Sequence, residues 1–343
     1  MHSLNLILMG LGNVGRAFAR LVGEKNSLCR ERYRLNLHLK AVLEKNGGFF
    51  SKRSLQPSEI GRLQASEMAE HPAWKPGLRL EEVLEKERTG VLVECTPTNL
   101  LTGEPGLSHI TLALKNKWHV AAASKGALVL NFKGLRALAQ KNGVSLKYSG
   151  AAAAALPTLD IGLFSLAGSE ILGIEGILTG VTNYILTRME EGLSFQEALK
   201  EAQAKGIAEL DPSLDIEGLD SAAKILLVSN SVAGMNFSLK DIRREGIRNV
   251  MPEDIQKARK EGKALKLLAR FDGQKDKPKA EVRLTAIENT HPLFYVSGTN
   301  KGITFFTDTM GPVTVTGGKS DPRGAAAALL KDIINISRYF SRV

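Results

Sequence analysis

The sequence predicts an α/β protein in which a doubly wound parallel sheet is followed by a second, α+β domain. Strand-like apolar segments alternate with helical segments over residues 1–150, and this order is typical of βαβ units in a parallel sheet. After residue 150 the alternation weakens, and several helices lead into β-rich segments. The length of 343 residues is sufficient for two domains with buried cores.

The first half of the chain contains five predicted strands, at residues 4–9, 35–44, 89–97, 119–124 and 144–150. Apolar residues recur at helical spacing between them. The predicted helices follow Gly15 and span residues 106–117 and 132–143, and a polar stretch with helical pieces occupies residues 51–88.

The second half has a different pattern. Helices are predicted at 183–192, 194–206, 219–232 and 252–262, and β-structure at 264–272, 279–288 and 303–317. The apolar periodicity of residues 323–340 indicates one long helix that returns to the first domain. We therefore expect a first domain of residues 1–150 with the C-terminal helix 322–343, and a second domain of residues 151–321.

Composition excludes several classes of protein. The apolar run 151–168 is interrupted by Pro157 and Asp160, so it is too short for a membrane span, which needs about 18 uninterrupted apolar residues. The N-terminus lacks a basic leader and a small-residue cleavage site, which predicts a cytoplasmic protein. Cys29 and Cys95 lack the spacing of a disulfide framework or a zinc site, and no metal site is predicted. The net charge of +10 is spread along the chain, which argues against a nucleic-acid partner.

A glycine motif follows the first predicted strand and opens a helix. Gly10-x-Gly12-x-x-Gly15, with Asn13 and Val14 inside it, has the context of a Rossmann-type dinucleotide-binding turn. One glycine makes the turn, one admits the pyrophosphate to the backbone, and one lets the helix pack closely on the strand. The motif predicts NAD or NADP as the cofactor. A tight turn without a ligand is the alternative.

An acidic residue ends the second predicted strand. Glu44 is placed to bind the ribose hydroxyls of the adenosine, which favours NAD. Lys45 follows immediately, and Lys52 and Arg53 come soon after, so cations are also present for the 2′-phosphate of NADP. An ordinary solvated strand end is the alternative for Glu44 and Lys45.

The stretch "GIAELDPSLDIEGLDSAAK" (206–224) contains five carboxylates and ends in Lys224. Gly206 and the Asp211-Pro212 step predict a loop over residues 206–218. Asp220 and Lys224 then lie four residues apart on one face of a helix. Taken alone, this spacing predicts a surface ion pair, but the apolar residues that follow indicate a partly buried lysine.

A second lysine stands at the end of a predicted parallel strand. Lys125, in "AAASKGAL", follows a strand of small residues. Ligands of open parallel sheets bind beyond the carboxyl ends of the strands, so Lys125 is a candidate catalytic or substrate-binding residue. A surface lysine in a loop is an equally good interpretation from the residues alone.

Several segments in consistent order resemble the homoserine dehydrogenase family over nearly the whole chain. They are "GLGNVG" (10–15), "SKGAL" (124–128), "GILTGVTNYILTRMEEG" (176–192), residues 206–224, "REGI" (244–247) and "HPLFYVSGTNKGITFFTD" (291–308). The family interconverts L-homoserine and L-aspartate 4-semialdehyde with NAD or NADP, on the route to threonine, methionine and isoleucine. The resemblance also implies a homodimer formed through β-structure of the second domain.

The resemblance assigns roles residue by residue. Glu209 and Asp215 would bind the α-ammonium group of the substrate, and Asp220 would orient Lys224. Lys224 and Lys125 would lie near the reacting oxygen and the substrate carboxylate, and either could transfer the proton. Further contacts to substrate or nicotinamide are implied for Thr96, Ser124, Gly180, Asn183 and Tyr184. The residues alone make "TNYIL" a helix start capped by Thr182 or Asn183.

The chain departs from the family pattern at a few positions. Ser124 stands where asparagine is common, and Val181 where threonine is usual. Family members have a glutamate after the tyrosine equivalent to Tyr148, followed by glycines, and this acid helps to bind a monovalent cation. Here Ser149 replaces the acid and alanines 151–155 replace the glycines, so the predicted cation site lacks its acidic ligand.

Two alternatives keep the predicted fold. One is a dehydrogenase for another amino-bearing hydroxy acid, and the other is a non-catalytic regulatory protein that binds a nucleotide. Both are motivated by the altered segment "YSGAAAAALP" (148–157). Because the chain ends at Val343, no appended regulatory domain is expected.

Overall fold

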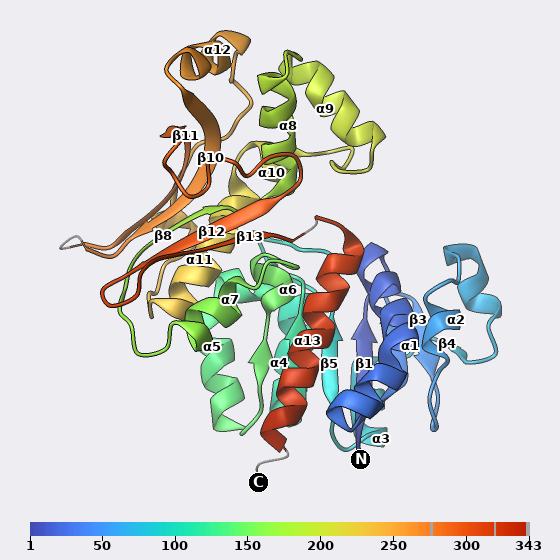
Figure 1. The fold of residues 1–343 in the computed structure, drawn as a ribbon. Coiled ribbons are helices and arrows are strands. Elements are labelled where there is room, and N and C mark those ends of the chain that lie inside the picture. Colours follow the sequence, from blue (N-terminus) through green and yellow to red (C-terminus); the bar gives the residue numbers. More distant parts are fainter. Residues whose placement is uncertain (275–276, 319, 341–343) are drawn as a thin grey trace. The chain divides into compact units, whose positions relative to one another are not determined.

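The computed structural model describes residues 1–274, 277–318 and 320–340. It contains two compact units, each built around its own sheet (Figure 1). Unit 1 consists of Met1–Ala154 together with Pro322–Val343, and unit 2 consists of Ala155–Asp321. No helix in the described part of the chain is long and apolar enough to cross a membrane.

Unit 1 contains a seven-stranded sheet in the order β4-β3-β2-β1-β5-β6-β7. Five strands are parallel: β1 (His2–Met9), β2 (Leu35–Glu44), β5 (Val91–Glu94), β6 (His119–Ala122) and β7 (Leu146–Lys147). Their carboxyl ends therefore meet at one edge of the sheet. Two antiparallel strands, β3 (Gly47–Phe50) and β4 (Trp74–Pro76), extend the sheet beyond β2.

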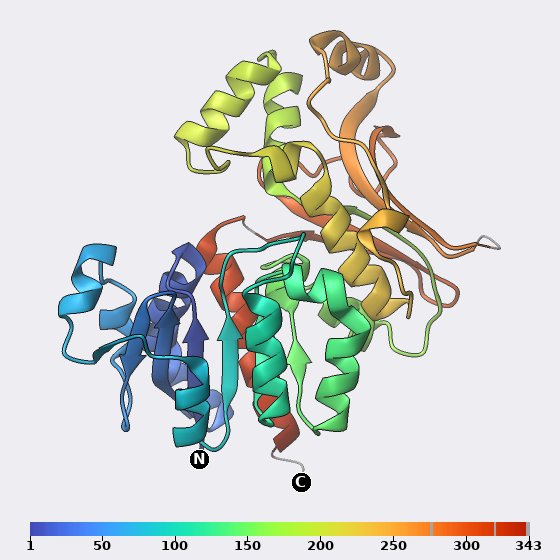
Figure 2. The ribbon, with the colours of Figure 1, turned by 180° about the vertical axis from the view of Figure 1, so that it is seen from behind.

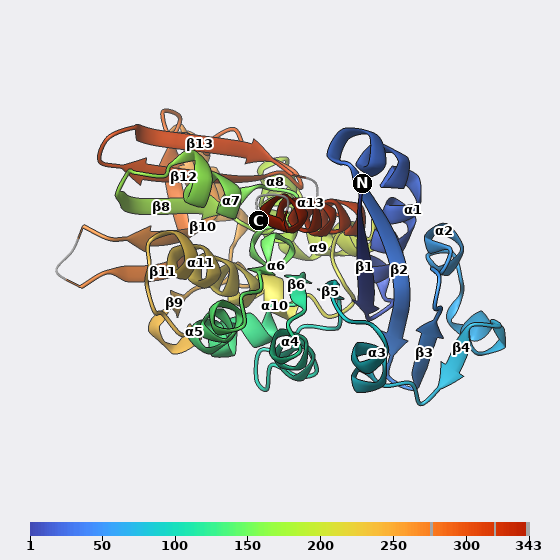
Figure 3. The ribbon, with the colours of Figure 1, turned by 90° about the horizontal axis from the view of Figure 1, so that it is seen from below.

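Helices cover both faces of this sheet, as Figure 3 shows. On one face lie α1 (Asn13–Tyr33) and α13 (Pro322–Phe340), and on the other lie α3 (Leu80–Lys86), α4 (Gly106–Lys115) and α5 (Gly126–Lys141). Unit 1 also contains two short α-helices, α2 (Pro57–Ile60) and α6 (Ser149–Ala152), and a 3-10 helix, Ala65–Glu70. Apolar residues of α1, α13 and the central strands form one core. The predicted doubly wound parallel sheet is confirmed.

Unit 2 contains a six-stranded sheet in the order β13-β12-β8-β10-β11-β9. The strands are β8 (Ile171–Ile177), β9 (Arg243–Arg244), β10 (Lys263–Asp272), β11 (Lys279–Glu288), β12 (Lys301–Thr307) and β13 (Gly311–Gly317). Its helices are α7 (Thr158–Asp160), α8 (Gly180–Glu190), α9 (Phe195–Ala204), α10 (Ser213–Ile216), α11 (Leu219–Val232) and α12 (Pro252–Lys260). Figure 2 shows α8 and α9 as a neighbouring pair.

Some sequence-predicted boundaries were wrong. The predicted strand 144–150 contains only the two residues of β7, because the chain turns into α6 at Ser149. Helix α5 begins at Gly126, six residues before the predicted start, with a kink at Asn131. Residues 206–218 are not all loop, since α10 begins directly after Pro212. The cap of α8 is Thr179, so neither Thr182 nor Asn183 begins that helix.

Ala154 has an unusual backbone conformation at the end of unit 1. Its φ angle is 53°, in the left-handed region that costs a residue with a Cβ roughly 1–2 kcal/mol. We expect Ala154→Gly to raise the free energy of unfolding by up to about 1 kcal/mol, since glycine adopts this conformation without that cost but loses more entropy. Urea denaturation measures the change.

The matched control is Ala152→Gly. Ala152 is buried in α6 with no positive φ, so this substitution removes a packed methyl group and should lower the free energy of unfolding. If both substitutions changed the free energy of unfolding in the same direction, the argument from backbone strain would be contradicted.

Candidate active site

The three glycines of the first turn differ in their surroundings. Gly10 has a φ of 87° and would place a Cβ 3.0 Å from the Cys95 carbonyl oxygen. A Cβ on Gly15 would overlap the Gly10 carbonyl oxygen, at 2.0 Å. At Gly12, the N-cap of α1, a Cβ would meet nothing within 4 Å. Two glycines thus serve close packing, and the third leaves space over the N-terminus of α1 for a phosphate group.

Glu44 lies at the end of β2, and its carboxylate accepts a hydrogen bond from the backbone N–H of Leu11 in the glycine turn. This contact fixes a negative charge beside the turn. Lys45 is exposed in the turn that follows. The second strand therefore presents a carboxylate to the turn, and the cation next to it faces solvent.

Glu94, which the sequence analysis did not single out, is the fully buried last residue of β5. One carboxylate oxygen accepts hydrogen bonds from the backbone N–H of Thr96, at 2.8 Å, and from its hydroxyl. Nδ1 of His109 lies 2.9 Å from the other oxygen. A buried carboxylate needs such partners, and these hold Thr96 at the carboxyl end of β5. The sequence did contain a signal for this residue, because Glu94 is an acidic residue at the end of an otherwise apolar strand, in the run "VLVEC".

Ser124 and Lys125 follow β6 at the same edge of the sheet. The backbone N–H of Lys125 donates to the Thr98 hydroxyl at 3.2 Å, which links the turns after β5 and β6. The Ser124 hydroxyl is buried and has no hydrogen-bond partner in the part of the chain that the structure describes. An unpartnered buried hydroxyl costs free energy unless a ligand or water pairs with it. Together with the open space at Gly12, it fits a nucleotide at this edge.

The turn after β7 carries a buried carboxylate from another part of the chain. Asp332 of α13 is 1% exposed and accepts hydrogen bonds from the backbone N–H and the hydroxyl of Ser149, at 2.9 and 2.8 Å. The Lys331 ammonium lies 2.8 Å from that hydroxyl and 3.2 Å from Asp332. Burial raises the pKa of Asp332, and the ammonium and the Ser149 hydrogen bonds oppose this shift.

These contacts bear on the cation that the family pattern implies. Ser149 offers a hydroxyl in place of a carboxylate, and that hydroxyl is already bonded to Asp332 and Lys331. In the described ranges 1–274, 277–318 and 320–340, no cluster of three or more His, Cys, Asp or Glu side chains could hold a metal ion. Because the Lys331 ammonium already lies beside Ser149 and Asp332, a second positive charge from an external cation does not fit there.

In unit 2, Lys224 lies on α11 and is held by two oxygens. Its ammonium is 2.6 Å from Oδ2 of Asp220 and donates to the Leu178 carbonyl at 2.9 Å. Both side chains are about one-seventh exposed, so this is not the surface pair that spacing alone predicts. The two oxygens engage two of the three ammonium protons. No third acceptor contacts this ammonium within the described residues 1–274, 277–318 and 320–340, so one proton is available to an oxygen of a ligand.

The acidic stretch divides into two groups of carboxylates. Asp211 accepts a hydrogen bond from the Ser213 N–H at the start of α10. Hydrogen bonding from the Ser213 side chain, and then from this N–H, lowers the pKa of the Asp211 carboxyl. Glu217 forms an exposed ion pair with Arg248 at 2.6 Å. Glu209 is exposed on a segment whose backbone carbonyls accept from Gln203, and Asp215 is half-buried in α10. Both belong to the acidic stretch in which the sequence predicts the contacts to a cationic ligand.

The first turns of α8 contain the other predicted substrate-binding residues. At Gly180 a Cβ would lie 2.7 Å from the Thr299 carbonyl oxygen, so the close approach requires glycine. The Asn183 amide donates to the carbonyls of Val296 and Asn300, at 3.3 and 3.1 Å, which makes it a tether for the loop before β12. The Tyr184 hydroxyl accepts from Lys205 at 2.9 Å. The structure thus gives Asn183 and Tyr184 contacts within the protein.

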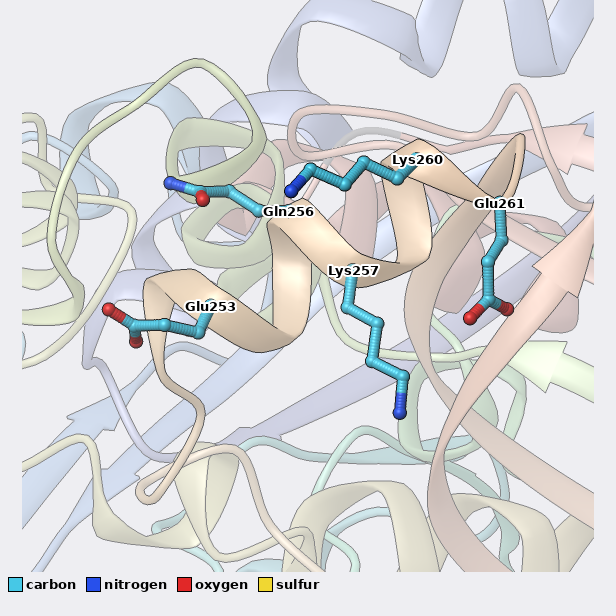
Figure 4. Close-up of a pocket in the computed structure, with 5 residues that line it drawn as sticks. All are labelled: Glu253, Gln256, Lys257, Lys260 and Glu261. Atoms are coloured by element: carbon cyan, nitrogen blue, oxygen red, sulfur yellow. The ribbon is translucent and has the colours of Figure 1, made fainter.

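A surface depression lies on α12. Figure 4 shows its lining, which comes from one helix and the residue after it: Glu253, Gln256, Lys257, Lys260 and Glu261. The lining contains both signs of charge and lies along one solvated helix. None of the residues carrying the predicted chemistry contributes to it, so we do not assign it to the active site.

The glycine turn, the carboxylate beside it and the polar ends of β5 and β6 define a dinucleotide-binding enzyme of the doubly wound class. Two family models match the chain: the NAD-binding domain of homoserine dehydrogenase over residues 10–149, and homoserine dehydrogenase over residues 157–334. The chain belongs to the homoserine dehydrogenase family. It is an NAD(P)-dependent oxidoreductase acting on a CH–OH group.

Individual relatives match over nearly their whole length. A homoserine dehydrogenase of Methanocaldococcus jannaschii is 38% identical over 97% of this chain and 98% of its own. An NAD(+)-dependent homoserine dehydrogenase of Pseudomonas canavaninivorans is 34% identical, covering 100% and 98%. The crystal structure of a putative homoserine dehydrogenase from Archaeoglobus fulgidus has a TM-score of 0.85 at 32% identity, covering 97% of this chain and 99% of that one. These matches favour homoserine dehydrogenase over the two alternatives that keep the fold.

Proposed function

We propose that the chain oxidises L-homoserine to L-aspartate 4-semialdehyde, or reduces the aldehyde, with Lys224 as the proton-transfer group. The observation that carries this assignment is the pairing of the Lys224 ammonium with Asp220 and the Leu178 carbonyl. Two fixed acceptors orient the group, and orientation is a large part of catalysis by positioned acids and bases. Bound NAD(P) supplies the hydride acceptor or donor.

The remaining residues have supporting roles in this proposal. When homoserine is oxidised, the hydride leaves carbon 4 and the hydroxyl proton passes to the neutral amine of Lys224, which becomes the ammonium. When the aldehyde is reduced, that ammonium returns the proton to the aldehyde oxygen. Glu209 and Asp215 bind the α-ammonium group, because carboxylates form charge-assisted hydrogen bonds with cations. Lys125 pairs with the substrate carboxylate. Thr96 and Ser124 contact the nicotinamide end of the cofactor, and the glycine turn binds its pyrophosphate.

We also propose NAD as the preferred cofactor. The Glu44 carboxylate bonded to the Leu11 N–H supports this, since a carboxylate there accepts from ribose hydroxyls and repels a 2′-phosphate. We expect Glu44→Ala to reduce the preference for NAD over NADP in kcat/KM by about tenfold or more, the effect of one lost charged hydrogen bond. Initial rates with each cofactor at saturating homoserine measure the ratio.

The control for Glu44 is Glu24→Ala, which removes another acid of unit 1. Glu24 pairs with Arg323 on the exposed surface of α1, so the cofactor ratio should stay within twofold of the parent. If Glu44→Ala also leaves the ratio unchanged, Glu44 does not select the cofactor.

The family pattern supports a homodimer that forms through the sheet of unit 2. We also propose that the protein is located in the cytoplasm. Light scattering coupled to gel filtration should give twice the chain mass of 37.1 kDa. A monomer over the micromolar range would rule out this part of the proposal and leave the activity untouched.

A further inference from the structure

The cluster formed by Ser149, Lys331 and Asp332 lies within unit 1 and joins the C-terminal helix to the turn after β7. Asp332 is separated from Ser149 by 183 positions in the sequence. Its carboxylate nevertheless accepts hydrogen bonds from both the backbone N–H and the hydroxyl of Ser149. Ser149 is the first residue of α6. The carboxylate of α13 therefore caps α6, and this cap is almost completely removed from water.

The turn held in this way packs directly on the end of β6, just before Ser124 and Lys125. A Cβ on Gly150 would lie 3.1 Å from the Ala122 carbonyl oxygen and 3.1 Å from Cα of Ala123. Ala122 ends β6, and Lys125 follows three residues later as the N-cap of α5. A displacement of α6 would therefore press on the backbone that positions Ser124 and Lys125.

The charge of Asp332 is balanced from within the chain. Carboxylates that are buried to this degree need a counter-charge or several hydrogen-bond donors. The Lys331 ammonium supplies the charge, at 3.2 Å from Asp332 and 2.8 Å from the Ser149 hydroxyl. This ammonium contacts the same hydroxyl that stands in place of the acid expected from the family pattern.

We propose that Asp332 and Lys331 are positioning residues for the cofactor side of the active site. In this proposal the Lys331 ammonium supplies the positive charge that an external monovalent cation would otherwise supply. The carboxylate comes from α13 instead of from position 149, and the cation is covalently part of the chain. The enzyme then requires neither Na⁺ nor K⁺. This inference rests on the proposed placement of the cofactor at the carboxyl ends of β5 and β6.

The test compares the parent with Lys331→Met and Lys331→Arg in NaCl, KCl and choline chloride at equal ionic strength. The parent should have the same kcat/KM for NAD in all three salts, within about 1.5-fold. Lys331→Met should lose about tenfold in choline chloride, the equivalent of one charged hydrogen bond, and recover in NaCl or KCl. Lys331→Arg should keep most of the activity in every salt.

Two measurements separate this inference from the activity itself. Calorimetric titration with NAD should show weaker binding by Lys331→Met in choline chloride alone, and the melting temperature of this variant should rise with Na⁺ or K⁺. Arg323→Met, which removes an exposed cation of the same helix, should match the parent throughout.

Several results would overturn the inference. One is activation of the parent by Na⁺ or K⁺ at constant ionic strength. Another is a Lys331→Met variant that behaves as the parent in all three salts, in both NAD binding and melting temperature. A third is a loss in this variant that no cation restores. Failure of the parent to oxidise homoserine with either cofactor would instead reject the proposed function and leave the NAD-binding and melting data to decide on the cluster.

Discussion

Replacing Lys224 by methionine is expected to lower kcat by about a thousandfold, within the range typical of a positioned proton-transfer group. The substitution keeps the length of the aliphatic stem but removes the ammonium that Asp220 and the Leu178 carbonyl hold. Lys224→Arg should be nearly as inactive, because a guanidinium retains the positive charge but does not release its proton. Steady-state rates with homoserine and NAD measure both effects.

The matched control is Lys266→Met. Lys266 is also a buried lysine of unit 2, 1% exposed on β10, with Glu190 as an ion-pair partner at 3.5 Å. Burial lowers its pKa, so replacing it removes a group that is costly to keep charged. We expect an altered melting temperature and a kcat within about twofold of the parent. Equal losses in the two variants would show that burial, and not proton transfer, accounts for the Lys224 effect.

Lys125 gives a further comparison for the same assignment. If Lys125 binds the substrate carboxylate, Lys125→Met should raise the KM for homoserine more than it lowers kcat. If Lys125→Met loses as much kcat as Lys224→Met and Lys224→Met keeps a measurable pH-dependent rate, the roles of the two lysines are reversed.

The second large effect is expected at the acidic stretch. Glu209→Gln should raise the KM for homoserine by about 10- to 100-fold, the loss of a hydrogen bond between charged groups. Asp215→Asn should act in the same direction. The reason is that the amide is neutral and no longer attracts the α-ammonium of the substrate. The KM for NAD should stay the same, which a two-substrate rate analysis can show.

Glu217→Gln is the control for this prediction. Glu217 lies in the same stretch, and its carboxylate already pairs with Arg248 at an exposed position. Exposed pairs contribute about 0–1 kcal/mol, so the KM for homoserine should remain within twofold of the parent. If Glu209→Gln and Glu217→Gln raise the KM equally, the stretch acts by general charge and not by a specific contact.

The elements of unit 1 that a local pattern specifies were predicted well. The strand, glycine turn and helix at residues 2–33 and the second strand at 35–44 follow from apolar periodicity and from the glycines. The antiparallel strands β3 and β4 were not predicted, because each has only three or four residues and gains its stability from pairing with a neighbour. The prediction made β7 too long, because the apolar residues next to its two residues pack around α6 and do not continue the strand.

The sequence by itself determined the family, the glycine turn and the four-residue spacing that pairs Asp220 with Lys224, because these depend on residue types at fixed local distances. Only the tertiary structure brought Glu94 to His109, the Leu178 carbonyl to Lys224, and Asp332 to Ser149. Such contacts join residues far apart in the chain. Their spacing in sequence carries no periodicity, and the folding of the strands and helices between them sets their distance. The missing acid at position 149 was visible in the sequence, and the carboxylate that α13 supplies there was visible only in the fold.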